Sequence, residues 1–500
     1  MLLPPRRPRR GRLIAATTAA ALLALLAYAS TFAIPYGTWF RSADPLLASD
    51  VARIAPARIA RLEHARDVDQ LGAVLRDARA RGLKVSIAGS RHSQGGHTYT
   101  AGGVRLDMRG FNRILAIDTV QGTVTVQSGA TWAELQRALA PHRLAIKVMQ
   151  SSNIFTVGGT LSANAHGRDL DVTQVVEVVE RFGLLLADGR VVEVSRGENR
   201  ELFGLVIGGY GLYGIILDVT LHVAPDELYE QRATIVDYQD FPAYFAQHIQ
   251  SDSGVVFLLA RPSIDPDSAA FLREMAVVTW RHASPGDTAS FALTEEQHVL
   301  RDRFFLGLSR RFDWAKKLRW SLQKKIELGT AERRVMSRNN AMRPPLAPLE
   351  LLTYHSRRNT DILQEYYIPV EQFVPFMDRF RTVLRDGRMN VISSTVRYVG
   401  PNATPVLAYA PTRPVFAIIH MSNVGLDSAS QAGARDVTRR LVDAAIEFGG
   451  TYYLTYQLYP TVEQLHRAYP NARRAFERKR FYDPDELFTS QFYEAYGRAP

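Results

Sequence analysis

The sequence predicts an α+β fold with two domains, preceded by an apolar N-terminal segment. The chain has 500 residues, which is more than one hydrophobic core usually supports. From about Val51 a helical pattern is followed by short strand-like runs, which Gly or Asp-Gly turns separate. Hydrophobic residues make up 46% and charged residues 22% of the chain, which is typical of a packed globular body.

The first 34 residues differ from the rest. Residues 6–12, RRPRRGR, contain five arginines, and residues 13–34 follow without a charge. An apolar run of this length can span a bilayer, and the arginines would stay in the cytoplasm. We therefore expect residues 1–34 to anchor the protein in a membrane, with the folded body on the periplasmic side. The alternative is an exported protein with a cleaved signal, because Ala27-Tyr28-Ala29 fits a cleavage site.

Composition excludes several functional classes. The absence of cysteine excludes disulfides, thiolate zinc sites, iron–sulfur clusters and cysteine nucleophiles. The formal net charge of +11 includes the five N-terminal arginines, so the body carries only a modest positive surplus. Bulk nucleic-acid binding therefore has little support, and we predict neither a nucleic-acid partner nor a metal site.

Local patterns define the elements of residues 50–225. The apolar spacing of residues 60–82, from Leu62 onward, predicts a helix that ends at Gly82, and a strand is expected at residues 83–89. Thr131 is expected to cap a helix, with Glu134 completing a capping box. Asp188-Gly189 predicts a hairpin turn between two strands.

Three glycine-rich clusters separate the strands of this region. They are AGSRHSQGGH (residues 88–97), QSSNIFTVGGTLSANAHGRD (residues 150–169) and GGYGLYGIILDVTL (residues 208–221). Glycine permits positive φ angles and close approach of a ligand, and consecutive backbone N–H groups can bind an anion. The first cluster alone also fits an ordinary turn with two surface histidines. Together the clusters predict one long ligand that lies across several strand ends.

The order and spacing of the three clusters resemble the FAD-binding domain of the vanillyl-alcohol oxidase family, especially its sugar-alcohol and aldonolactone oxidase branch. The resemblance covers residues 50–225 and continues more weakly to the C-terminus. It implies a two-domain FAD-binding fold with a β-rich cap domain. The implied parts are an FAD-binding domain at residues 50–225, a substrate or cap domain at 226–445, and a C-terminal segment at 446–500 that returns to the FAD-binding domain.

The resemblance also implies cofactor-binding positions. The pyrophosphate is expected near Ala88, Gly89, Ser90, Arg91 and Ser93. The isoalloxazine and ribityl groups are expected near Thr156, Val157, Gly158, Gly159, Ser162, Asn164, His166 and Gly167, and the adenine end near Ile216. His166 also fits a turn that only caps the backbone. The family often attaches the flavin covalently to a histidine, which corresponds to His92. His97 is the competing residue, and noncovalent FAD is the alternative.

Three cap segments contain the expected substrate-site residues. Glu365, Arg397 and His420 each lie in or beside a strand-like run that would otherwise be core, and a buried ionisable group needs a partner. By resemblance to the alditol oxidases, Glu365 or His420 takes the hydroxyl proton and Arg397 holds the developing negative charge. A satisfied salt bridge is the structural alternative for each.

The implied activity is oxidation of a hydroxyl (CH–OH) on a sugar-like, sugar-alcohol, aldonolactone or related substrate by hydride transfer to flavin N5. The electron acceptor is dioxygen, a quinone or another carrier, and Gln150 favours a dehydrogenase. The alternatives are an enzyme for a lipid-linked pentose at the membrane and a flavin-fold protein that binds without turnover.

A basic stretch extends from Arg301 to Arg343, where thirteen Lys and Arg residues accompany four acids. Apolar residues recur within it at helical spacing. The pattern fits an interfacial helix on anionic lipid, and it equally fits a cap helix whose basic face is solvated.

Overall fold

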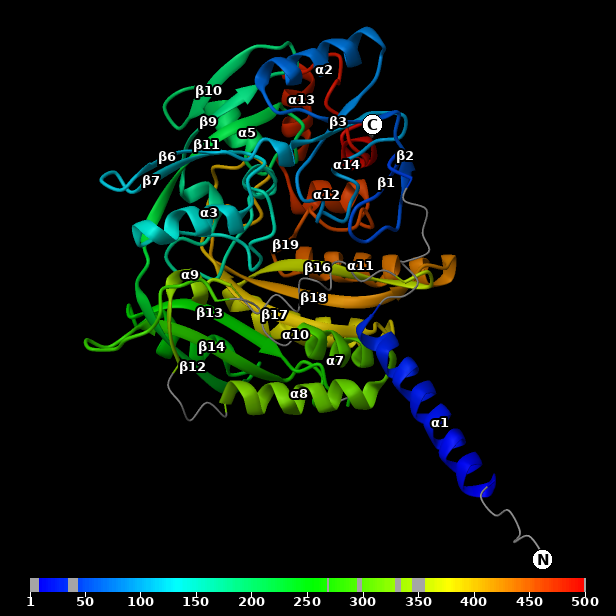
Figure 1. The fold of residues 1–500 in the computed structure, drawn as a ribbon. Helices are drawn as coiled ribbons and strands as arrows, with labels where there is room; N and C mark the ends of the chain where they lie inside the picture. The colour runs from blue at the N-terminus through cyan, green and yellow to red at the C-terminus, as the bar shows by residue number, and fades with distance from the viewer. Residues whose placement is uncertain are drawn as a thin grey trace, which may run out of the picture.

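The computed structural model describes residues 9–34, 44–267, 269–294, 299–328, 334–343 and 356–498. It is a mixed α/β structure in which helices surround four sheets, so the predicted mixture of helix and sheet is confirmed (Figure 1). The helices are α1 (Arg9–Ala33), α2 (Val68–Ala80), α3 (Trp132–Leu139), α4 (Val157–Ser162), α5 (Arg200–Val206), α6 (Phe241–Phe245), α7 (Val299–Arg311), α8 (Asp313–Leu328), α9 (Arg338–Ala341), α10 (Phe373–Asp386), α11 (Ser428–Glu447), α12 (Val462–Ala468), α13 (Ala472–Tyr482) and α14 (Gln491–Tyr496).

The N-terminal half contains three of the sheets. Short strands β1 (Leu47–Ala48) and β2 (Ala57–Arg58) pair with each other, and β3 (Arg61–His64), β5 (Val104–Asp107) and β4 (Val85–Ala88) form a parallel sheet in that order. The third sheet has the order β10-β9-β11-β7-β6, with β8 paired to β11. Its strands are β6 (Ile114–Asp118), β7 (Thr123–Gln127), β8 (Leu144–Ile146), β9 (Val179–Leu185), β10 (Val191–Ser195) and β11 (Ile215–Pro225).

Two local predictions for this half are confirmed and one is wrong in part. β9 and β10 form the hairpin around Asp188-Gly189, and Thr131 caps α3 with Glu134 completing the capping box. The helix expected at residues 60–82 begins only at Val68, because Asp67 accepts a hydrogen bond from the Gln70 backbone at 2.8 Å and starts the helix. Leu62 lies instead in β3, which pairs with β5.

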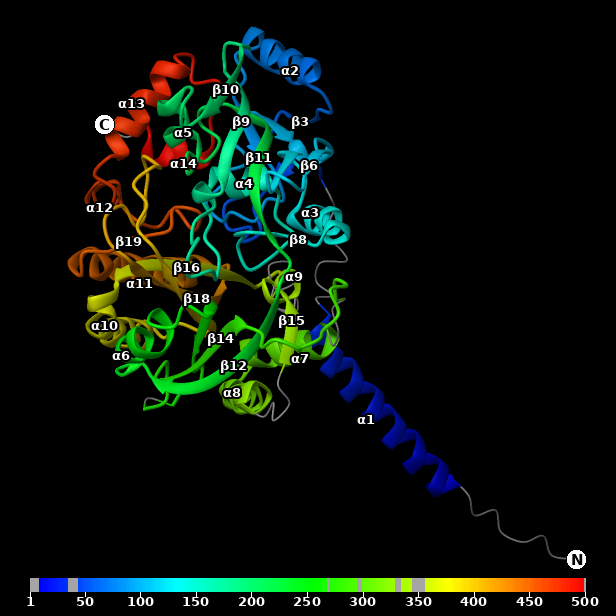
Figure 2. The ribbon, with the colours of Figure 1, turned by 90° about the vertical axis from the view of Figure 1, so that its left-hand side faces the viewer.

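The C-terminal half is built on an eight-stranded sheet with the order β15-β12-β14-β13-β17-β18-β16-β19. The strands are β12 (Leu228–Asp237), β13 (Val255–Pro262), β14 (Glu274–His282), β15 (Arg334–Ser337), β16 (Asn359–Pro369), β17 (Val391–Val399), β18 (Val415–Gly425) and β19 (Thr451–Tyr452). In the views of Figures 1 and 2 this sheet lies below the glycine-rich loops. Helices α10 and α11 pack against β16, and α11 also packs against β18.

Most of the basic stretch forms α7 and α8, and its residues 334–337 form β15 rather than helix. Helix α1 projects from the body beside α7 (Figure 2). Its residues Ile14–Ala33 are long and apolar enough to cross a membrane. Phe32 is buried against Phe304 and Phe312, and a Cβ at Gly307 would lie 2.0 Å from the Phe32 carbonyl oxygen. The end of α1 therefore packs closely on α7.

Residues 487–489, in the C-terminal segment, complete the parallel sheet. Phe488 forms a parallel bridge with Val85 of β4, and the Val85 backbone N–H donates to the Leu487 carbonyl at 2.7 Å. Buried Asp483 holds this segment in place. It forms an ion pair with buried Lys479 and accepts the backbone N–H groups of Leu487 at 2.9 Å and Phe488 at 2.8 Å.

Replacement of Asp483 by Asn should lower the free energy of unfolding by about 3–5 kcal/mol, because it leaves the buried Lys479 ammonium without its counter-charge. The matched control is Asp485→Asn, which removes an exposed ion pair with Arg79 and should cost less than about 1 kcal/mol. Denaturant unfolding measures both. Equal losses in the two variants would contradict the structural role of Asp483.

Candidate functional site

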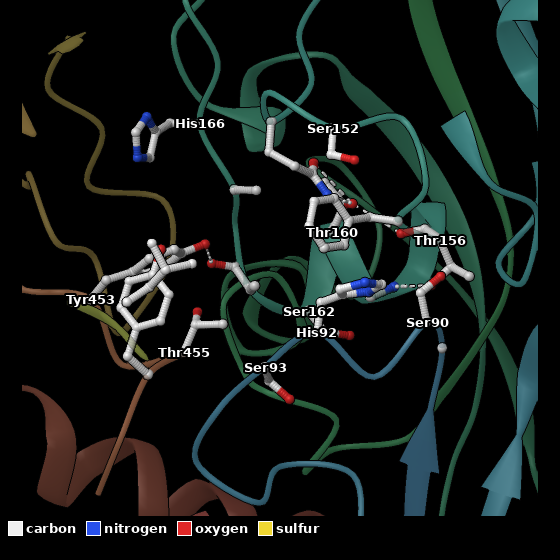
Figure 3. A pocket seen from close by; sticks show the side chains of 18 of the residues that line it. Ser90, His92, Ser93, Ser152, Thr156, Thr160, Ser162, His166, Tyr453 and Thr455 are labelled. Atoms are coloured by element: carbon white, nitrogen blue, oxygen red, sulfur yellow. Dashed lines mark hydrogen bonds between the residues drawn. The ribbon is translucent and has the colours of Figure 1, made fainter. Parts of the chain in front are cut away.

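A cavity lies between the glycine-rich loops and the eight-stranded sheet. Its volume is about 370 Å³, within the range of small-molecule sites. Figure 3 shows Ser90, His92 and Thr156 on one side of this cavity and His166 and Tyr453 on the other. The cavity therefore joins the first two predicted clusters to the later part of the chain.

The first loop is shaped by its contact with the second. A Cβ at Gly89 would lie 2.0 Å from Thr156 Oγ1, so this position requires glycine. The Ser90 hydroxyl donates to the Ile154 carbonyl at 2.8 Å. Arg91 has a φ of 61°, a left-handed conformation that a non-glycine residue rarely adopts. These contacts turn the chain directly after β4 and bring His92 to the cavity wall.

His92 has the environment of an uncharged imidazole. Its ring contacts the Phe155 ring edge-on at a centroid distance of 4.6 Å, and its buried Nδ1 atom has no hydrogen-bond partner. Burial, assisted by the charge of Arg91, lowers the pKa of His92 to about 4. At neutral pH the ring is therefore unprotonated and a nitrogen lone pair is available.

His97 also lines the cavity, but aromatic rings enclose it. Its ring centroid lies 4.9 Å from that of Phe492 and 5.1 Å from that of Tyr210. Burial lowers the pKa of His97 to about 4. Packing between two rings gives His97 a structural role that His92 lacks.

The second cluster forms the short helix α4 and the loop that follows it. Thr156 caps this helix by accepting the Gly159 backbone N–H at 3.3 Å. A Cβ at Gly158 would lie 2.7 Å from the Ser128 Cβ, which explains a glycine at this close approach to the turn after β7.

The structure separates the predicted cofactor residues into two groups. Those that line the cavity are Gly89, Ser90, Arg91, His92, Ser93, Thr156, Gly158, Gly159, Ser162, His166 and Ile216. Those that do not line it are Ala88, Val157, Asn164 and Gly167. The second group supports the wall from behind: Val157 belongs to the hydrophobic core and Asn164 donates to Gln174 at 2.9 Å, for example.

A buried carboxylate occupies the opposite wall. Glu365 on β16 contacts His166 Nε2 through Oε1 at 2.5 Å and accepts the Tyr456 hydroxyl through Oε2 at 3.1 Å. Both Glu365 and His166 are almost fully buried. Burial and the nearby negative charge of Glu365 raise the pKa of Tyr456 well above its ordinary value, so this tyrosine remains a hydrogen-bond donor. His166 thus has a specific partner and does more than cap a turn.

Arg397 on β17 lies in the same cavity wall. Its Nη2 atom donates to Ser151 Oγ, and its buried Nε atom has no partner. Burial lowers the pKa of Arg397, and the charge of Glu365 opposes this shift. A cation and a carboxylate therefore face one cavity. Gln150 also lines it and donates to Thr160 Oγ1 at 2.9 Å.

The prediction that His420 belongs to the substrate site is wrong. Glu365 is paired with Ile419 across the sheet, and successive side chains of a strand point to opposite faces. Ile419 and Met421 line the cavity, whereas His420 packs on the other face against Phe380 of α10 at 5.5 Å. Burial there lowers the pKa of His420 to about 3.

Sequence reasoning missed several residues that line the cavity. They are Ser128, Ser151, Ser152, Arg168, Arg261, Tyr453, Thr455 and Tyr456. Arg168 directly follows the His-Gly pair of the second cluster, which is the one signal that could have found it. Ser151 and Ser152 lie in the same cluster, at its start, and the remaining residues lie on segments that approach the site only in the folded chain.

The cavity wall fits a polar ligand such as FAD. It contains buried side-chain atoms without partners: His92 Nδ1, Ser93 Oγ, Thr98 Oγ1, Ser128 Oγ, His166 Nδ1, Arg397 Nε and Thr455 Oγ1. Buried polar groups are normally hydrogen-bonded, so a wall of this kind matches a ligand that is itself rich in polar atoms.

Comparison with known proteins agrees with this geometry. Residues 59–195 match the family described as FAD binding domain. Decaprenylphosphoryl-beta-D-ribose oxidase of Mycolicibacterium smegmatis is 25% identical over 475 residues, covering 90% of this chain and 95% of that protein. L-gulonolactone oxidase of Bos taurus is 31% identical over 158 residues, covering 32% of this chain and 36% of that protein. L-gulono-1,4-lactone dehydrogenase of Mycobacterium tuberculosis is 30% identical over 160 residues, again covering 36% of that protein.

These findings define an FAD-linked oxidoreductase. The resemblance to FAD-binding oxidoreductases of the vanillyl-alcohol oxidase type, the FAD cofactor and the enzyme class predicted from the sequence are therefore confirmed.

Proposed function

We propose that this protein oxidises a CH–OH group of a sugar-like, sugar-alcohol, aldonolactone or related substrate in the cavity described above. FAD bound there would be the acceptor of the hydride and its two electrons. The observation that supports this activity best is the Glu365 carboxylate, which two donors hold in the same cavity as Arg397. We further propose that residues 50–225 and 226–445 form an FAD-binding domain and a cap domain, with residues 446–500 returning to the first.

Glu365 is the proposed base for the hydroxyl proton. His166 and Tyr456 hold its two oxygens, which fixes the direction in which the carboxylate can accept a proton. Arg397 is positioned to stabilise negative charge that develops on the substrate oxygen. Ile419 and Met421 add apolar surface to the same wall.

Two alternative functions differ from this proposal in the substrate or in whether an alcohol reduces the bound flavin. An enzyme for a lipid-linked pentose would use the same residues, and the similarity to decaprenylphosphoryl-beta-D-ribose oxidase favours this substrate class. A flavin-binding protein without turnover would retain the cofactor and reduce it with no alcohol. Dioxygen and a quinone are the proposed electron acceptors.

Glu365→Gln should slow the reduction of bound flavin by an alcohol substrate by about 10²- to 10⁴-fold, because the amide cannot accept the proton. His420→Gln is the matched control, since it changes a buried residue on the other face of the same sheet. It should leave the rate within about threefold, given that it touches no reacting group. Stopped-flow absorbance of the flavin measures both rates. A slow His420→Gln variant beside a fast Glu365→Gln variant would reverse the assignment.

We propose His92 as the covalent attachment residue for FAD. His92 lies at the cavity wall directly after the turn that follows β4, whereas the rings of Phe492 and Tyr210 enclose His97, and this difference supports His92 over His97. Acid precipitation should leave the yellow colour in the pellet of the wild type and release it from His92→Ala. His97→Phe, which keeps a ring between Phe492 and Tyr210, should retain the colour in the pellet. Release of flavin from the wild type would show that the cofactor is noncovalent.

We also propose that α1 anchors the protein in a membrane, with the body outside the cytoplasm, and that α8 lies on the lipid surface. Phe312 contacts both Phe32 of α1 and Trp314 of α8, so the anchor and this helix share one apolar surface. Trp314 and Leu318 are 58% and 41% exposed, and exposed Lys325 lies on the same face of the helix. Exposed aromatic and basic side chains together favour an anionic lipid surface. The alternative is a solvated cap helix.

A protein without residues 1–27 keeps the contacts of Phe32 and isolates the contribution of α8. It should sediment with phosphatidylglycerol vesicles, and the double variant Trp314→Ser, Leu318→Ser should bind about tenfold more weakly because apolar area is lost. Val120→Ser removes a more exposed apolar side chain from the β6–β7 turn and should bind like the parent. A parent that ignores the vesicles would leave α8 as a solvated helix.

A further inference from the structure

The side of the cavity next to the eight-stranded sheet carries more positive than negative charge. It is lined by Arg261 of β13, by Arg397 of β17 and by Arg168, which lies in the loop after α4 and whose carbonyl accepts the backbone N–H of Leu258 in β13. In the part of the chain that the structure describes, the one carboxylate in the lining is Glu365. An excess of cations in a buried wall requires compensation, because buried charges are costly unless they are paired.

Two of the three arginines have evident partners. Arg261 forms an ion pair with Glu327 of α8. Arg397 donates to Ser151 and is close enough to Glu365 for that carboxylate to raise its pKa against the effect of burial. Arg261 therefore has a counter-charge, and Arg397 has a hydroxyl acceptor and a carboxylate nearby.

Arg168 is different. Its side chain is buried, and its Nη1 atom donates to the Ala341 carbonyl at 3.2 Å. The Nε and Nη2 atoms are buried without a hydrogen-bond partner. Burial, together with repulsion from Arg397 and Arg261, holds the pKa of Arg168 well below its usual value. No carboxylate among the described residues forms an ion pair with it.

A nearby arginine shows how the same fold satisfies a structural guanidinium. Buried Arg338 forms an ion pair with Asp169, the residue after Arg168, and donates to the Ile146 carbonyl at 3.2 Å. Asp169 is thus committed to Arg338. Arg168, in contrast, lines the cavity wall with N–H groups on Nε and Nη2 that have no protein acceptor.

We propose that Arg168, assisted by the neighbouring Arg261, binds a phosphoryl group carried by the alcohol substrate. A guanidinium presents parallel N–H donors that match two phosphoryl oxygens, and its charge compensates the anion. The anionic group and the oxidised hydroxyl then lie in one cavity, so Arg168 selects the substrate while Glu365 accepts the proton. This inference rests on the proposed function, since it names the class of substrate.

The first test measures anion binding without turnover. Inorganic phosphate is titrated into the FAD-loaded protein by calorimetry, and the thermal midpoint is followed in parallel. The wild type should bind phosphate, Arg168→Lys should bind it more weakly, and Arg168→Met should lose at least about tenfold in affinity. Arg232→Met, which removes an exposed arginine paired with Glu230, should bind like the wild type.

The thermal midpoint without phosphate separates a binding role from a structural one. Loss of a buried, unpaired cation should leave Arg168→Met at least as stable as the wild type when no phosphate is present. A large loss of stability in Arg168→Met, together with an unchanged phosphate affinity in Arg168→Lys, would overturn the proposal. Equal phosphate affinity in all four proteins would overturn it as well.

The second test separates this inference from the proposed function. The ratio of kcat/KM for ribose 5-phosphate over ribose, and for a prenylphosphoryl ribose over a prenyl riboside, should fall about 10- to 100-fold in Arg168→Met. The pair that responds identifies whether the phosphoryl group belongs to a free sugar phosphate or to a lipid. Phosphate binding without oxidation of any alcohol would reject the proposed function and keep the anion site. Oxidation of neutral alcohols, with the same kcat/KM ratio in Arg168→Met as in the wild type, would keep the proposed function and reject the anion site.

Discussion

The site depends on the two hydrogen bonds of the buried Glu365 carboxylate, because they join three distant segments of the chain. Glu365 belongs to β16 of the large sheet, His166 belongs to the glycine-rich loop after α4, and Tyr456 belongs to the C-terminal segment. A buried charge requires partners that surround it. Its burial therefore brings the loop, the sheet and the C-terminal segment together, and the cavity wall is complete only when all three are in place.

The parts of this structure that the sequence predicts correctly are those with local causes. The capping box of Thr131 and Glu134 and the hairpin at Asp188-Gly189 depend on residues a few positions apart. Leu62 was expected in a helix because its spacing is helical, but pairing with β5 places it in a strand. That pairing joins positions more than forty residues apart in the sequence, so no local pattern indicates it.

The error at His420 has a different cause. Almost every residue of β18 is buried, so the strand shows no alternation between apolar and polar positions. Such a strand does not reveal which side chains face a cavity and which face a helix. Arg168 was missed for a simpler reason: the family pattern ends at Gly167, and the importance of the next residue depends on Arg261 and Arg397, which the fold brings near.

The contact between Phe488 and β4 has a consequence for the order in which the protein is assembled. β4 leads directly into the loop that carries His92, and Phe488 completes its sheet. The two paired segments lie about 400 positions apart, as the 403-residue separation of the neighbouring Ser86–Thr489 hydrogen bond shows. During synthesis this edge of the sheet therefore stays open until Phe488 has left the ribosome, and the loop after β4 gains its full support only then.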